Sequence, residues 1–192
     1  MDRSVEGKEV NTTVASDNVA GGRQAAEALA EAIGEQGKVI VLQGVAGTSA
    51  SRDRGQGFEE GIADFPDIEV VAMQPANFDR AQGLDVATNL LQSNPDVTGI
   101  FAENDEMALG AIQALGDRAG DEVFVVGFDG TDDGLSAIEE GTLHATIAQQ
   151  PAELGRVGVE QALAVIAGED VEPEQSVEVV TVTVDNVGDF LQ

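Results

Sequence analysis

The chain has 192 residues, with 36 acidic and 9 basic side chains, one histidine and no cysteine, tryptophan or tyrosine. A formal net charge of −27 opposes contact with phosphate backbones, which excludes an electrostatically driven nucleic-acid binder. Without cysteine there is no disulfide framework, thiolate metal site or cysteine nucleophile. Apolar residues make up 42 %, as in a globular domain, and no apolar run is long enough to predict a transmembrane helix.

The acidic side chains are spread evenly along the chain. Residues 1–50, 51–100, 101–150 and 151–192 carry 7, 9, 11 and 9 of them, so no acidic tail or block stands out. A dispersed excess of this kind, with only two lysines, favours a hydrated surface that keeps a halophilic protein soluble at high salt concentration. A specific cationic partner is the alternative interpretation.

Apolar, β-rich runs alternate with helix-period segments along the chain. Strands are predicted at 10–15, 38–42, 68–72, 97–102, 123–128, 143–148 and 177–184. Helices are predicted at 19–33, 49–62, 79–91, 106–115, 132–140 and 152–167, and the Asp17-Asn18 pair offers an N-cap for the first of them. This alternation indicates an α/β doubly wound fold, with a mainly parallel sheet covered by helices on both faces.

Polar and aromatic side chains follow several of the predicted strands. Ligands of such sheets bind outside the carboxyl ends of the strands, where the connecting loops splay apart. That edge would collect Arg54, Phe78, Asn104, Asp129 and Gln149. An aromatic ring packs against the C–H face of a sugar, carboxylate and amide oxygens accept from hydroxyls, and a guanidinium donates in a fork. The set therefore suits a neutral, polyhydroxylated ligand better than an anionic one.

Each of these residues also has a simpler interpretation. Asp129 could belong to an ordinary turn, and Asp105 or Asp132 could serve only as helix caps. Phe78 could be a core residue beneath a loop. Arg54 could be a hydrated cation on the surface of a helix.

Signals of catalysis or of a metal site are weak. The glycine-containing loop at 44–49 has no lysine after its glycine, which argues against a phosphate-binding loop. His144 is the only histidine and lies in a predicted strand without a second metal ligand, which favours a structural role. We therefore expect neither an enzyme nor a bound metal or cofactor.

Five longer strings are more specific than these patterns. LQGVAGTSASRDRGQGF, QPANFDRAQGL, FAENDEMALGAIQAL, VVGFDGTDDG and ATIAQQP resemble the type I periplasmic binding proteins of sugar ABC importers, which share their fold with the effector domains of LacI-type repressors. The resemblance extends from Asp2 and Arg3 to the last predicted strand. It implies two α/β lobes, joined by a three-stranded hinge, that close on one monosaccharide such as D-ribose.

The resemblance also implies a set of ligand-binding residues. By position in the matching strings, these are Asp2, Arg3, Arg54, Phe78, Asn104, Asp129 and Gln149. Asp2 and Arg3 would approach the sugar from the first lobe, and Gln149 would lie where the chain crosses the hinge. The others would belong to the second lobe, with Phe78 as a stacking residue.

The beginning of the chain departs from the family pattern, which starts with a strand and an aromatic-bearing loop that are not present here. We therefore expect a fragment: 1–16 a remnant of the first lobe and hinge, 17–149 the sugar-binding second lobe, 150–178 a further first-lobe remnant, and 179–192 a closing strand and tail. Half a site would bind a monosaccharide weakly or not at all. An uncovered apolar stripe of Val159, Ala162, Leu163 and Ile166 would drive self-association.

The function expected from the resemblance is that of a non-enzymatic, extracytoplasmic component that delivers a monosaccharide to an ABC permease of the membrane. The first residues, Met1-Asp2-Arg3, lack the basic-then-apolar character of a signal peptide, so this localisation depends on the resemblance. A sugar-responsive effector domain of a LacI-type regulator is an alternative, opposed by the charge. A chemoreceptor-coupled protein that binds a sugar or furanosyl signal is another.

Overall fold

The computed structural model of the chain describes residues 9–191. Its strands are β1 (Thr13–Ser16), β2 (Gly37–Gln43), β3 (Ile68–Pro75), β4 (Gly99–Ala102), β5 (Phe124–Asp129), β6 (Ala145–Ala148), β7 (Glu174–Val177) and β8 (Val180–Thr183). Its helices are α1 (Asn18–Ala32), α2 (Ser49–Ile62), α3 (Arg80–Ser93), α4 (Asp105–Leu115), α5 (Asp132–Glu139) and α6 (Pro151–Ala167), with short 3₁₀ turns at Gly116–Arg118 and Val187–Asp189. Within residues 9–191, no helix combines the length and the apolar character needed to cross a membrane.

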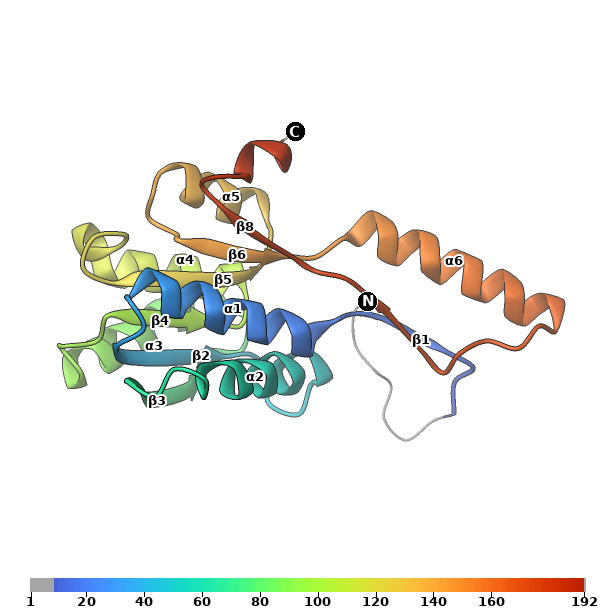
Figure 1. Cartoon of the computed structure of the whole chain (residues 1–192), viewed down its shortest axis with the longest axis horizontal. Helices are drawn as coiled ribbons and strands as arrows, with labels where there is room; N and C mark the ends of the chain where they lie inside the picture. The colour runs from blue at the N-terminus through green and yellow to red at the C-terminus, as the bar shows by residue number, and fades with distance from the viewer. Residues whose placement is uncertain (1–8, 192) are drawn as a thin grey trace.

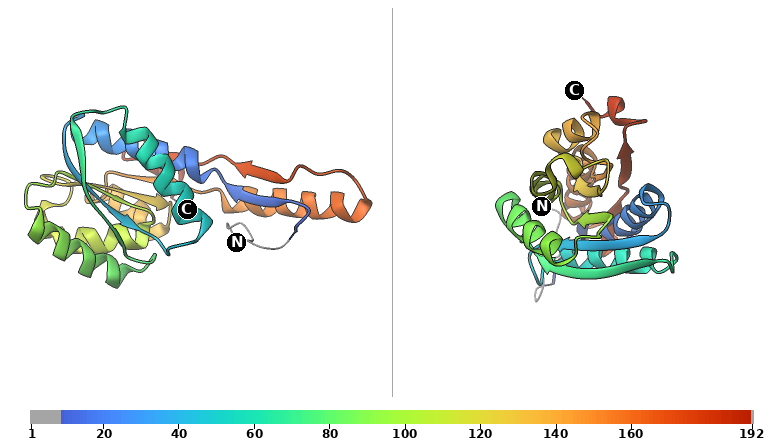
Figure 2. Two further views of the ribbon diagram at one scale, coloured as in Figure 1. Left: turned by 90° about the horizontal axis from the view of Figure 1, so that it is seen from below. Right: turned by 90° about the vertical axis from the view of Figure 1, so that its left-hand side faces the viewer.

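Six strands form one large sheet in the order β3-β2-β4-β5-β6-β8. Neighbouring strands run parallel, except that β8 is antiparallel to β6. Helices α1 and α2 cover one face of this sheet, and α3, α4 and α5 cover the other (Figures 1 and 2). The predicted doubly wound α/β fold is confirmed.

The core consists of two apolar clusters, one on each face of the large sheet. Every residue of β4 and β6 is buried, which explains why these strands are apolar on both sides. On the α1/α2 face, the ring of Phe58 stacks on that of Phe101 with 4.5 Å between centroids. On the other face, Met107 and Ile138 pack against the sheet.

The last predicted strand, 177–184, contains β8 and only the final residue of β7, which begins at Glu174. β7 pairs with β1 in a separate two-stranded parallel sheet, whereas β8 pairs with β6 of the large sheet. β8 follows the apolar alternation of a strand, whereas Glu174, Gln175 and Ser176 of β7 are all polar, so the sequence gives no sign of this strand. The first predicted strand, 10–15, is also too long at its start, since β1 begins at Thr13.

Side chains cap the beginnings of five helices. The cap residues are Asp17, Thr48, Asp79, Asn104 and Thr131, for α1 to α5 in turn. Asp17 confirms the predicted N-cap. The caps of α4 and α5 are Asn104 and Thr131, so the interpretation of Asp105 and Asp132 as caps is wrong.

Helices α1 and α2 approach each other at two glycines. A Cβ atom on Gly22 would lie 2.2 Å from the main-chain oxygen of Arg54, and one on Gly57 would lie 2.0 Å from that of Val19. Non-bonded carbon and oxygen atoms do not come so close in a packed interior, so neither position has room for a side chain. Helix α2, which carries Arg54, is therefore held against α1 at backbone contact.

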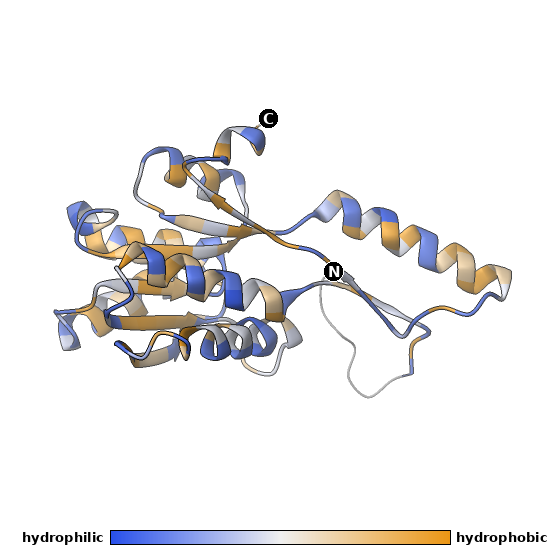
Figure 3. Cartoon of the chain, in the orientation of Figure 1, coloured by the Kyte–Doolittle hydropathy of each residue, from blue (hydrophilic) through white to orange (hydrophobic). Residues whose placement is uncertain are grey.

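α6, β1 and β7 form an arm that projects beyond the large sheet (Figure 1). No residue of α6 is buried. Val159, Leu163 and Ile166 are 61 %, 60 % and 81 % exposed, and Figure 3 shows hydrophobic segments along the helix. Ala162 is exposed as well, so the apolar stripe predicted on this helix is uncovered in the structure.

Candidate functional site

Five predicted site residues lie at the carboxyl edge of the large sheet. Arg54 is on α2, Phe78 precedes α3, Asn104 caps α4, Asp129 ends β5 and Gln149 follows β6. The last two are joined directly, because the Gln149 N–H donates to the main-chain oxygen of Asp129 at 3.1 Å. Two further predicted residues, Asp2 and Arg3, lie outside the described residues.

Arg54 is almost entirely buried, with 4 % of its surface exposed. Its Nη1 lies 3.0 Å from Oδ1 of Asp129 and donates to the main-chain oxygen of Glu103 at 2.6 Å, while Nε donates to Oδ1 of Asn18 at 2.9 Å. The guanidinium carbon also lies 3.7 Å from the centroid of the Phe128 ring. The interpretation of Arg54 as a hydrated surface cation is therefore wrong, and its position is fixed from several sides.

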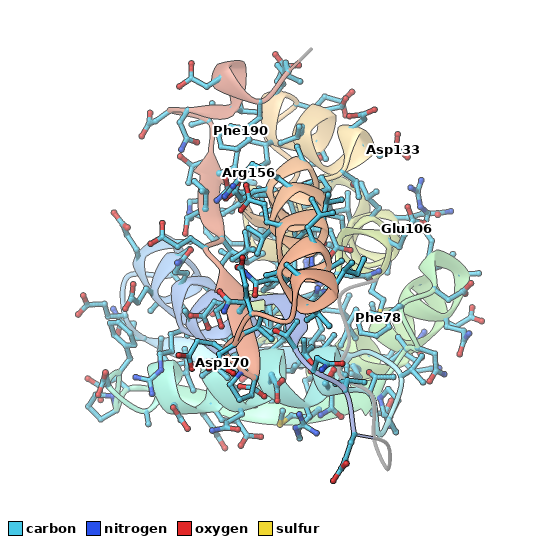
Figure 4. The ribbon with its side chains drawn as sticks, turned by 90° about the vertical axis from the view of Figure 1, so that its right-hand side faces the viewer. Phe78, Glu106, Asp133, Arg156, Asp170 and Phe190 are labelled. Carbon is cyan, nitrogen blue, oxygen red and sulfur yellow. The ribbon has the colours of Figure 1, made fainter. Side chains whose placement is uncertain are left out.

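Phe78 is half-buried and packs against the core cluster on the α3/α4 face. The centroid of its ring lies 5.9 Å from the guanidinium carbon of Arg54. Figure 4 faces the end of the molecule from which α6 projects, and there Phe78 lies on the side that carries α3. The ring also covers Gly44, where a Cβ atom would lie 2.0 Å from Cζ of Phe78. Phe78 thus has a packing role, as the simpler interpretation predicts, and it also lies beside Arg54.

Asn104 and Asp129 both have defined local roles. Oδ1 of Asn104 accepts from the Met107 N–H at 3.0 Å, and Nδ2 donates to the main-chain oxygen of Phe78 at 3.4 Å. Asp129 adopts φ of 117°, a region that side-chain-bearing residues rarely occupy. With this strained backbone the Asp129 carboxylate lies against Arg54. Asp129 is therefore more than a residue of an ordinary turn.

The buried carboxylate of Asp105, which the sequence suggested only as a helix cap, links the start of α4 to β6 and to the loop after β5. Oδ1 of Asp105 accepts from Oγ1 of Thr146 at 2.7 Å, and Oδ2 accepts from N and Oγ1 of Thr131 at 2.8 and 3.0 Å. Burial raises the pKa of the Asp105 carboxyl, and these hydrogen bonds oppose the rise. Because Thr131 follows Asp129 by two residues, the network stabilises the loop that carries the site aspartate. The feature of the sequence that could have revealed this network is Thr146, a polar residue inside the otherwise apolar strand β6.

Two cavities flank the N-terminal end of α2. One of about 370 Å³ is lined by Gln43, Gly47 and Gln56 among others. Another of about 180 Å³ lies between α2 and the arm and is lined by Asn18 and Gln175 among others. Their walls carry amides, small residues and charged side chains, with Arg52 in both linings, so a small polar molecule can reach this end of α2 from either side.

Nothing in residues 9–191 groups three or more His, Asp or Glu side chains as a metal site would require. The ring of His144 is half-buried and meets Phe124 edge-on, with 5.7 Å between centroids. This packing agrees with the predicted structural role of the histidine.

The periplasmic binding protein domain family matches residues 1–170 of the chain. The ribose import binding protein of Escherichia coli is 51 % identical over 178 residues, which are 93 % of this chain and 60 % of that protein. This chain therefore spans well under two thirds of the relative's length.

Solved structures of binding proteins from sugar ABC transporters share the fold. A solute-binding protein of Actinobacillus succinogenes with bound D-allose superposes with a TM-score of 0.86 at 37 % identity, covering 91 % of this chain and 62 % of that one. The arabinose-binding protein of Shewanella sp. ANA-3, bound to L-arabinofuranose, has a TM-score of 0.91 at 29 % identity, covering 98 % and 65 %. From the family match, the identity and the shared fold it follows that this chain belongs to the periplasmic binding protein family.

Proposed function

We propose that the chain binds a neutral monosaccharide, with D-ribose as the first candidate, as the solute-binding component of a sugar ABC importer. The observation that carries this proposal is the Arg54–Asp129 pair, 3.0 Å apart, with the Phe78 ring and the Asn104 amide beside it. The pair offers charged donors and acceptors to hydroxyls, and the ring offers an apolar face to the sugar. The ribose import of the Escherichia coli relative supports ribose as the ligand.

The proposed site is one-sided in the described part of the chain. Arg54, Phe78, Asn104 and Asp129 belong to the body built on the large sheet, and β1, α6 and β7 pack on each other beyond it. We propose that 17–149 is the sugar-binding second lobe, that 1–16 and 150–178 are remnants of the first lobe and hinge, and that 179–192 is a closing strand and tail. A ligand held from one side keeps much of its contact with water, so we expect millimolar affinity for this chain.

Nuclear magnetic resonance titration tests the proposal, because it detects weak binding residue by residue. D-ribose added to the ¹⁵N-labelled chain in molar KCl should shift the amide signals of the loops after β2, β3, β4, β5 and β6. Asp129→Asn should weaken this response, since it removes the charge paired with Arg54. Asp132→Asn is the matched control, as this exposed side chain lies three residues further on at the start of α5. Shifts confined to other surfaces, or no response to ribose, allose or arabinose, would contradict the proposal.

We further propose that the protein works outside the cytoplasm and delivers its sugar to an ABC permease. Support comes from the relatives, which are binding proteins of import systems. Antibody labelling of intact cells should detect the protein at the surface. If the protein is periplasmic instead, osmotic shock should release it, and detection only after the cytoplasmic membrane is broken would count against this localisation.

The apolar stripe on α6 is proposed as a self-association surface whose occupant is a second copy of the chain. Val159, Leu163 and Ile166 follow the i, i+4, i+7 spacing by which two helices pack side by side. Sedimentation at high salt, which screens the net charge of −27, should show a dimer. Leu163→Lys should abolish it, whereas Gln161→Lys, which adds the same charge on another face of α6, should not. A monomer in both salt conditions would overturn this proposal.

A further inference from the structure

Glu103, at the end of β4, has a completely buried carboxylate. Its Oε2 accepts from the Gly44 N–H at 2.7 Å and also from the Ser51 hydroxyl. Oε1 is buried as well and accepts no hydrogen bond from the residues that the structure describes. A buried carboxylate with one unpaired oxygen is unfavourable, so its presence requires an explanation beyond packing.

The contacts of Glu103 reach several parts of the candidate site. Its main-chain oxygen accepts from Nη1 of Arg54 at 2.6 Å, and the residue after it is Asn104. Gly44, which its side chain holds, is the residue covered by the Phe78 ring. Glu103 therefore ties both the β2–α2 loop and the site arginine to the end of β4.

We infer that Glu103 is a positioning residue of the proposed sugar site, whose ionised carboxylate holds the Gly44 loop in the binding arrangement and whose protonation loosens that loop and weakens sugar binding. The inference rests on the proposed function. Its physical basis is the strength of hydrogen bonds to an ionised acceptor, which is about twice that of bonds to a neutral one. Protonation thus weakens the bonds from Gly44 and Ser51 together.

The surroundings of Glu103 allow this change near neutral pH. Burial raises the pKa of its carboxyl to about 7. The hydrogen bonds from Ser51 and Gly44 oppose the rise, and so does the positive charge of Arg54. Both protonation states are therefore populated in the physiological range.

The charged groups on the neighbouring elements have their own partners. Arg54, on α2, is paired on its other side with Asp129 at the end of β5. Asp105, at the start of α4, accepts from threonines of β6 and of the β5–α5 loop. Of these groups, Arg54 is the one whose charge acts on the ionisation of Glu103.

The experiment follows the Gly44 amide signal of the ¹⁵N-labelled 192-residue chain from mildly acidic to mildly alkaline pH, because this N–H donates to the Glu103 carboxylate. In the wild type, the Gly44 signal should titrate with a midpoint near 7, the pKa of Glu103. In Glu103→Gln, which cannot ionise, this titration should be absent. Exposed Glu139→Gln is the matched control and should titrate like the wild type.

The same samples are then titrated with D-ribose at each end of the pH range. Affinity of the wild type should fall about fivefold toward acidic pH, the factor expected when charge-assisted hydrogen bonds become neutral ones. Glu103→Gln should show the weaker affinity at both ends, without pH dependence. Glu139→Gln should behave as the wild type does.

The possible failures are distinguishable. If no sugar binds at any pH, the proposed function fails and this inference falls with it. If ribose binds but the wild type shows no pH dependence, or Glu103→Gln keeps the same dependence, the positioning role is overturned while the proposed function stands. Should Glu103→Gln not fold, the wild-type titration decides alone: ribose affinity must follow the Gly44 midpoint, and affinity that ignores it refutes the inference.

Discussion

Gly44 is a position at which a single added methyl group should disturb the aromatic part of the site directly. A Cβ atom there would lie 2.0 Å from Cζ and 2.3 Å from Cε1 of Phe78, whereas carbon atoms in contact lie about 3.5–4.0 Å apart. In Gly44→Ala the ring must therefore move by about 1.5 Å away from residue 44, which disturbs its packing on the core cluster. Overpacking of this kind costs about 1–3 kcal/mol, and we expect the free energy of unfolding to fall by that amount.

Urea denaturation followed by circular dichroism measures this loss. Phe78→Leu, with its shorter side chain, should relieve the crowding, so a double-mutant cycle should give a coupling energy of about 1 kcal/mol or more between the two positions. Gly155→Ala is the control, because a Cβ there meets no atom within 4 Å. It should stabilise the chain by about 0.5–1 kcal/mol through helix propensity. Additive effects, or an undiminished stability of Gly44→Ala, would refute the packing of the ring on Gly44.

Further predictions concern buried polar groups and salt. Thr146→Val removes the hydroxyl that donates to Asp105 and should lower the free energy of unfolding by about 1–3 kcal/mol in urea titrations, whereas Thr146→Ser should retain most of it. Burial lowers the pKa of His144, so its neutral form is favoured in the folded state and stability should fall as pH drops through the unfolded value of 6.5; in His144→Phe this fall should be smaller, and an equal fall would contradict the reasoning. Burial raises the pKa of Glu103 to about 7, so its contribution has the opposite sign, being present below the unfolded value of 4.5 and lost as pH rises through 7. Relative to Glu103→Gln, the wild type should therefore lose roughly 2–3 kcal/mol between about pH 5 and pH 8, and parallel curves would exclude the raised pKa. Finally, we propose that the excess of 36 acidic over 9 basic residues is an adaptation to high salt, so the melting temperature should fall as KCl is removed; indifference to salt would argue against it.

The local order of elements was predictable because each is determined by nearby residues. Helix α2 begins and ends at the predicted residues, Ser49 and Ile62, since Thr48 caps it and the apolar period stops at its end. The partner of a strand is a different matter. β7 carries three polar residues and forms through its pairing with β1, which lies far away in the chain, whereas the alternating β8 pairs with β6.

The candidate site was predictable to the extent that strand ends converge on one edge. Arg54, Phe78, Asn104 and Asp129 do meet there. Their supports were not predictable, because these contacts join residues far apart in the chain. The Ser51–Glu103 and Asp105–Thr146 hydrogen bonds span 52 and 41 residues, and a polar residue after a strand does not reveal whether its side chain faces water or the interior.

The backbone contact between α1 and α2 has a consequence for how binding proteins of this kind can diverge. Gly22 touches the main chain of the very residue that carries the site guanidinium, so any side chain there would push α2 outward and carry Arg54 with it. An outward shift of roughly one methyl width, about 2 Å, would take the 3.0 Å Arg54–Asp129 pair beyond hydrogen-bonding distance. Gly22 therefore acts as a spacer of fixed, minimal thickness, remote from the ligand. We therefore expect ligand preference to vary through the residues that surround the sugar. Gly22, by contrast, keeps α2 close to α1 and so keeps Arg54 within hydrogen-bonding distance of Asp129.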